Sequence, residues 1–172
     1  MKKMEFEGPW KLLWTEPGER ERREIPAQVP GNVIGDLFRN GLIPDPRFGC
    51  NSNDLCKYES VDWEYKTVFR RPALKAGEKL RLVFEGIDTV AEIFVNGTRI
   101  GRAENMFISH AFDLDPALLR DENELAVKIK SAVGHARTLP PTTPGCRAQP
   151  YNYEGLRRGE VFQPQSAGRS AL

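Results

Sequence analysis

The sequence predicts an all-β fold, a two-sheet sandwich of the jelly-roll kind with one short helix. Apolar and polar residues alternate with a period of two in short runs from residue 1 to about residue 132. Turn residues recur about every 8 to 12 positions, and no helix of crossover length separates consecutive runs. At 172 residues the chain has the length of one domain.

The first elements are a strand and a helix. In "EIPAQV", Ile25, Ala27 and Val29 alternate with polar residues, as in a half-buried strand. "GNVIGDLFRNG" is the one plausible short helix. Its apolar side is predicted to hold Val33, Ile34, Leu37 and Phe38, with Gly41 as its stop.

The middle of the chain predicts two more strands. In "DWEYKTVFRRP", alternate residues share one face of the predicted strand: Trp63, Tyr65, Thr67 and Phe69. Glu64, Lys66 and Arg70 fall largely on the other face. In "EKLRLVFEG", Leu80, Leu82 and Phe84 alternate with charged residues until Gly86 ends the run.

A hairpin and three further elements follow. The runs 90–95 and 98–100 flank Asn96-Gly97, a pair that readily takes the positive φ angles of a two-residue turn. "NMFISHAFDLD" predicts a half-buried strand, and "DPALL" a helical turn capped by Asp115. "NELAVKIKSA" predicts a final strand with Leu125, Val127 and Ile129 inward.

The last 40 residues differ from the rest. Prolines and glycines recur from Val133 to Leu172, with no sustained helix or strand period. The sequence therefore predicts a sandwich domain over 1–132 and an irregular tail over 133–172.

Composition excludes several kinds of partner. Lys plus Arg is 25 and Asp plus Glu is 24, so no global field favours nucleic acid or an anionic membrane. No apolar run approaches the length that spans a bilayer, and residues 1–14 are too polar for a signal peptide. We therefore expect a cytoplasmic protein. Cys50, Cys56 and Cys146 form no CxxC pair and are interpreted as free thiols.

The inventory of reactive groups predicts no catalytic residue in this chain. Carboxylates occur close together at Asp62/Glu64 and Asp113/Asp115 and around residues 121–124, but solvated edges and turn caps explain such spacings better than an acid and base do. His110 and His135 lie in no metal-binding spacing, and neither GxSxG nor GxGxxG occurs. We therefore expect no metal and no cofactor.

One segment has the composition of a sugar site. "NGLIPDPRFGCNSNDLCKYESVDWEY" is a long, polar, proline-broken connection that leads into an aromatic residue. Amide and carboxylate groups bind sugar hydroxyls, and an aromatic face packs on the apolar side of a sugar ring. The candidate substrate-binding residues are Asn51, Asn53, Asp54, Glu59, Asp62 and Trp63. The alternative is a surface loop rich in Asx turns.

Five ordered segments carry a family resemblance: "PAQVPGNVIGDLFRNGLIPDP", "DWEYKTVF", "LVFEGIDTVAEIFVNGTRIG", "NMFISHAFDL" and "ENELAVKIKS". Together they resemble the N-terminal sugar-binding domain of β-mannosidases in glycoside hydrolase family 2. The resemblance implies a jelly-roll, galactose-binding-like sandwich that packs against an (α/β)8 catalytic barrel and helps to wall the sugar pocket. In that family the barrel carries both catalytic glutamates and removes terminal β-linked mannose with retention.

This chain departs from the family pattern after residue 132. It lacks the Trp-Asp-Trp-Gly-Pro segment and the closing strands that typically follow the "ENEL" strand, so we expect an open sheet edge. Ile34 stands where a histidine is common, and Lys57 where a tryptophan is common.

Three hypotheses follow. The chain is a truncated β-mannosidase-like domain that is inactive without its barrel, a free-standing module that binds β-mannoside carbohydrate, or an interaction domain that completes a separately encoded glycosidase subunit.

Overall fold

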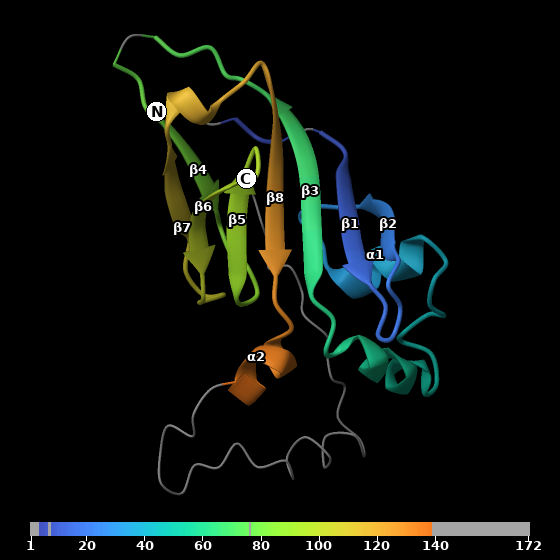
Figure 1. Ribbon diagram of the computed structural model, residues 1–172. Coiled ribbons are helices and arrows are strands. Elements are labelled where there is room, and N and C mark those ends of the chain that lie inside the picture. Colours follow the sequence, from blue (N-terminus) through green and yellow to red (C-terminus); the bar gives the residue numbers. More distant parts are fainter. Residues whose placement is uncertain (1–3, 7, 76, 139–172) are drawn as a thin grey trace, which may run out of the picture.

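The computed structural model describes residues 4–6, 8–75 and 77–138, and within them the chain forms two antiparallel sheets (Figure 1). The larger sheet has six strands in the order β2-β1-β3-β8-β5-β6. These are β2 (Arg22–Ala27), β1 (Trp10–Thr15), β3 (Trp63–Arg70), β8 (Glu122–Ile129), β5 (Ala91–Val95) and β6 (Thr98–Ala103). The all-β prediction is confirmed.

The second layer is smaller. It pairs β4 (Leu80–Phe84) with β7 (His110–Leu114) and faces one half of the six-stranded sheet. The other half is covered by helix α1 (Val33–Arg39) and the 3-10 helix η1 (Asn51–Tyr58). The core lies between these layers, so the molecule is a β-sandwich completed in part by helices.

The strand faces follow the predicted alternation. On β3, Trp63, Tyr65 and Thr67 are buried in the core, while on β8 the inward residues are Leu125, Val127 and Ile129. On α1, Val33 and Leu37 are buried, but Phe38 is 39% exposed and does not join the core. Gly41 ends this helix with a φ of +70°.

The Asn-Gly hairpin forms as predicted, and its asparagine also makes tertiary contacts. Asn96 and Gly97 have φ angles of 51° and 80°. The Asn96 amide donates to the Leu118 carbonyl at 2.9 Å and to Asn123 Oδ1 at 2.8 Å. Asn96 Oδ1 accepts the Glu124 N–H at 3.0 Å, so the turn is fixed to the start of β8.

Several elements differ from the prediction. Strand β1 was missed because its burial pattern, with Leu13 and Trp14 both buried, breaks a simple alternation. The connection over residues 40–65 contains η1, and the predicted irregular tail begins with helix α2 (Ala132–Thr138). The rest of that tail, 139–172, lies outside the described residues, as does Cys146. Asp115 caps the 3-10 helix η2 (Pro116–Leu118) as expected, accepting the Ala117 N–H at 2.8 Å.

A buried carboxylate joins α1 to the sheet. Asp36 is 0% exposed, accepts the Gln28 N–H at 2.9 Å and the Tyr65 hydroxyl at 2.9 Å, and forms an ion pair with Arg39. Burial, together with the charge of Asp36 and the hydrogen bond to it, holds the pKa of Tyr65 well above its ordinary value. Helix α1 is therefore anchored by polar contacts as well as by apolar packing.

Candidate functional site

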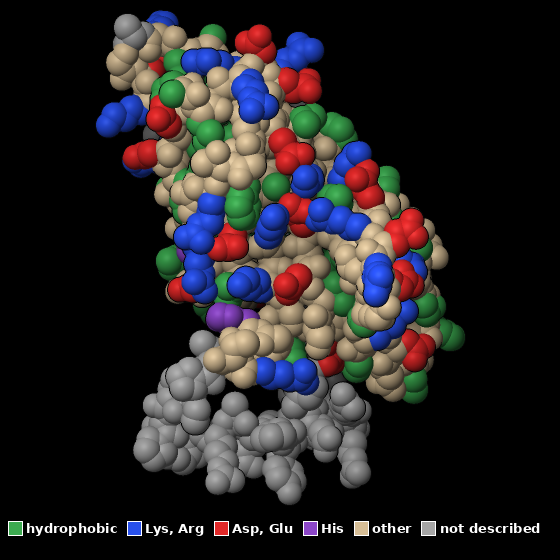
Figure 2. All heavy atoms as spheres, viewed as in Figure 1, with side chains coloured by type: hydrophobic (Ala, Val, Ile, Leu, Met, Phe, Trp, Pro, Cys, Tyr) green, Lys and Arg blue, Asp and Glu red, His purple; other side chains and the backbone are tan. Residues whose placement is uncertain are grey.

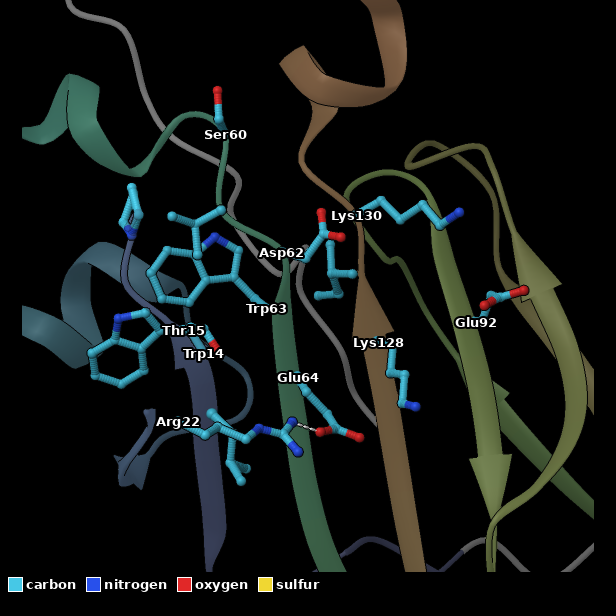
Figure 3. Close-up of a pocket in the computed structure, with 14 residues that line it drawn as sticks. Trp14, Thr15, Arg22, Ser60, Asp62, Trp63, Glu64, Glu92, Lys128 and Lys130 are labelled. Atoms are coloured by element: carbon cyan, nitrogen blue, oxygen red, sulfur yellow. Dashed lines mark ion pairs between the residues drawn. The ribbon is translucent and has the colours of Figure 1, made fainter. Parts of the chain in front are cut away.

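A hollow of about 690 Å³ opens on the outer face of the six-stranded sheet, the face turned away from the core. It lies where β1 and β8 end and β3 begins (Figure 3). Fourteen residues line it: Leu13, Trp14, Thr15, Pro17, Arg22, Ser60, Val61, Asp62, Trp63, Glu64, Glu92, Lys128, Ile129 and Lys130.

Strand register produces the charged wall of this hollow. Glu64 pairs with Leu13 on one side and with Lys128 on the other, and Lys128 pairs in turn with Glu92. Antiparallel partners point to the same face of a sheet. These four side chains therefore form one row across four strands.

The charges in this row are compensated. Arg22 forms an ion pair with Glu64, whose side chain is 7% exposed, and Arg99 Nη1 lies 2.8 Å from Glu92 Oε1. Lys128 Nζ lies 4.6 Å from the centre of the Phe94 ring. Figure 2 shows Lys, Arg, Asp and Glu side chains interspersed over this face. Apolar side chains and charges of both signs line the hollow, and no single sign dominates its row.

The structure places two of the six predicted site residues at the hollow. Asp62 and Trp63 line it. The Trp63 ring packs against Trp14, 5.6 Å between centres, and Tyr58, 5.8 Å, and the residue is only 2% exposed. Its ring therefore belongs to the core and turns no open face to solvent.

The other four lie on or next to η1, outside the hollow's lining. Asn53 and Asp54 are exposed on the first turns of η1. Asn51 Nδ2 donates to the Asp45 carbonyl at 2.9 Å and so holds the preceding loop. Glu59 follows the helix as its C-cap. The structure thus separates the six residues into two groups: Asp62 and Trp63 at the hollow, and the η1 group of Asn51, Asn53, Asp54 and Glu59. Sugar binding by either group stays a prediction.

Ser131, which the sequence analysis missed, ties the two groups together. Its N–H donates to Asp62 Oδ1 at 2.7 Å, and its hydroxyl donates to the Glu59 carbonyl at 2.5 Å. The same hydroxyl accepts the Gly134 N–H at 2.7 Å, which caps α2. A serine before a short helical run is a recognisable N-cap, but its contacts with residues 59 and 62 depend on strand pairing.

The other carboxylate pairs also have structural roles. Arg81 Nε donates to Asp113 Oδ1 at 2.7 Å and, chiefly through this hydrogen bond, holds the pKa of that carboxyl below its usual range. Lys66 Nζ lies 3.0 Å from Glu124 Oε1. Across the described residues no group of His, Cys, Asp or Glu is arranged to hold a metal ion, and no described helix is long and apolar enough to cross a membrane.

These features define a β-sandwich module with an open hollow of mixed lining on one sheet face. The chain belongs to the glycosyl hydrolase 2 galactose-binding domain-like family, whose sequence model matches residues 10–163. It is 40% identical to β-mannosidase of Mus musculus over 114 residues, which are 66% of this chain and 13% of the mouse protein. It is 33% identical to β-mannosidase B of Aspergillus terreus over 151 residues, which are 87% of this chain and 18% of the fungal protein.

Solved structures agree. The β-D-mannosidase of Dictyoglomus thermophilum matches with a TM-score of 0.68 and 34% identity over 86% of this chain and 18% of that chain. A β-glucuronidase of Ruminococcus gnavus matches with a TM-score of 0.52 and 20% identity over 74% of this chain and 20% of that chain, which shows the shared fold. The chain corresponds to the N-terminal domain of β-mannosidase-like proteins of glycoside hydrolase family 2, and it spans less than a fifth of each β-mannosidase named.

Proposed function

We propose that this chain serves as the non-catalytic N-terminal domain of a glycoside hydrolase that removes terminal β-linked mannose. The observation that carries the proposal is 33% identity to a β-mannosidase over 87% of the chain. The proposed partner is an (α/β)8 catalytic barrel, in the same polypeptide or supplied by a second one. Retaining chemistry by two glutamates would reside in that barrel, and the sandwich would shape the approach to it.

Within this role, the exposed residues of η1 are the best candidates to contact sugar. Asn53 and Asp54 present an amide and a carboxylate to solvent, and both groups bind hydroxyls well. Asn51, Glu59 and Asp62 take part in hydrogen bonds that fix the loop around them. We therefore assign them the task of holding the η1 group in place.

Assays of the purified chain with an aryl β-mannoside test whether catalysis resides outside this domain. We expect no turnover above the rate in buffer, because neither proposed catalytic glutamate belongs to this domain. The control is a full-length β-mannosidase such as the Aspergillus terreus protein, assayed in parallel. Turnover that survives rigorous removal of host glycosidases would contradict the proposal.

The open hollow favours one second candidate, a module that binds β-mannoside without a barrel. Concave sites with a few convergent polar groups are typical of small-ligand binding. Calorimetric titration with mannose and β-manno-oligosaccharides separates the two roles. Heat of binding that Glu92→Gln in the hollow removes would support the free-standing module, and no heat at millimolar ligand with folded protein would exclude it.

A further inference from the structure

The turn between β6 and β7, residues 104–109, carries three consecutive exposed apolar side chains, and we refer to it as the Phe107 turn. Phe107 is 86% exposed, Ile108 52% and Met106 37%. Single exposed apolar residues are common on protein surfaces, but contiguous groups mark interaction sites. The turn is therefore a candidate site for contact with a partner.

Hydrogen bonds order this turn and hold its apolar residues outward. The Phe107 N–H donates to Asn105 Oδ1 at 2.9 Å, and the His110 Nε2 lies 2.7 Å from the Asn105 carbonyl oxygen. Asn105 thus braces the turn on both sides of Phe107. An ordered turn loses less conformational entropy on binding than a mobile one does, which favours docking.

Strand register places the Phe107 turn beside the point where the chain leaves the sandwich. Ala91, at the start of β5, pairs with Ala103 at the end of β6 and with Ile129 at the end of β8. Because neighbouring strands lie about 4.8 Å apart, the ends of β6 and β8 are separated by about 10 Å. The turn follows the end of β6 directly, and α2 follows the end of β8, at the same end of the molecule (Figure 1).

The outer sheet face is a poorer docking surface than this turn. Its ion pairs, among them Arg22–Glu64 and Glu92–Arg99, would have to be desolvated on contact with an apolar partner. The exposed apolar residue Val68, by contrast, pairs with Glu124 at the start of β8 and so lies at the opposite end of the sheet. Burial of the Phe107 turn therefore gains apolar contact without breaking an ion pair of that face.

The relatives supply the kind of partner. This chain matches 13% of the mouse β-mannosidase and 18% of the Aspergillus terreus protein, so most of each relative lies outside the matched part. We propose that the Phe107 turn docks the sandwich onto an apolar recess of the catalytic part of a glycoside hydrolase, beside the chain that leaves β8. This inference rests on the proposed function and deepens it by naming the contact surface.

Binding measurements with a defined probe test the inference. The probe is the Dictyoglomus thermophilum β-mannosidase from which the segment matched by this chain has been removed. We expect the full chain to bind it, and the double variant F107S/I108T to bind on the order of 30-fold more weakly, because aromatic anchors dominate interfaces. The matched control is V68T, whose parent side chain is 47% exposed against 52% for Ile108. We expect less than a twofold change for this control.

A chimeric enzyme serves when the truncated probe does not fold. In it, residues 1–138 of this chain replace the matched segment of the Dictyoglomus thermophilum β-mannosidase. We compare the rates of thermal inactivation of this chimera with and without F107S/I108T. Sizing of the chain alone reports self-association.

Equal binding and equal inactivation of the wild-type and F107S/I108T forms would overturn the inference while leaving the proposed function intact. A folded probe that does not bind the wild-type chain would overturn both. A dimer of the chain that F107S/I108T abolishes would assign the turn to a second copy instead.

Discussion

Replacing Trp63 by alanine is expected to lower the free energy of unfolding by about 3–5 kcal/mol, the usual cost of deleting a buried tryptophan. The ring is 2% exposed and packs against Trp14 and Tyr58, so its loss leaves a cavity in the core. Urea denaturation followed by tryptophan fluorescence and circular dichroism measures the change.

The same variant separates a packing role from a sugar-binding role. Asn53→Ala, at an exposed position of η1, is the control and is expected to change stability by less than about 0.5 kcal/mol. A Trp63→Ala protein of unchanged stability would mean that the ring is free for other use. Such a result would restore Trp63 as a stacking platform for a sugar.

Asp36→Ala is expected to cost about 3–5 kcal/mol, the range found when one partner of a buried charge network is removed. The substitution leaves the buried Tyr65 hydroxyl without its acceptor and also removes the acceptor of the part-buried Gln28 N–H. Thermal and urea denaturation measure the loss.

The matched control for this variant is Asp45→Ala. Asp45 also pairs with an arginine, Arg47, at 3.1 Å, but both side chains are solvent-accessible. Because exposed ion pairs contribute little, we expect a change below about 1 kcal/mol. Equal losses in the two variants would contradict a special role for the buried network.

The network also predicts how stability depends on alkaline pH. The pKa of Tyr65 is raised in the folded state, so the folded protein keeps this proton after the unfolded chain has begun to lose its own near pH 10. The unfolded state then binds fewer protons than the native state, and stability falls as pH rises. Above pH 10, Tyr65 is expected to lower the free energy of unfolding by about 1.4 kcal/mol for each pH unit. Well below pH 10, it is expected to add nothing to the pH dependence of stability.

Comparison with Tyr65→Phe isolates this contribution. We expect the variant to be less stable than the wild type at neutral pH, and its stability to fall less steeply between pH 10 and 11. Parallel slopes for the two proteins would exclude Tyr65 as the source.

Residues close together in sequence determined most of the strand prediction. The alternation in residues 63–70 and 122–129 predicted which side chains face inward, because a strand turns successive side chains to opposite faces. The pair Asn96-Gly97 predicted a turn with positive φ angles. The family resemblance was likewise contained in five ordered segments, and the match over residues 10–163 confirms it.

The candidate site was predicted less well, since the sequence shows which groups are present but not which are already in use. Asp62 looked like an available polar ligand, yet its carboxylate accepts the N–H of Ser131, about 70 residues later in the chain. Trp63 looked like a sugar platform, yet its place in the inner row of β3 commits its ring to the core.

The sequence by itself thus determined the fold class, the hairpin and the family, all of which depend on local patterns and their order. Only the tertiary structure decided that Leu13, Glu64, Lys128 and Glu92 share one wall of a hollow, because that row is assembled from four strands by register. It also decided that the Phe107 turn lies near the end of β8, because antiparallel pairing places the ends of β6 and β8 on either side of the start of β5.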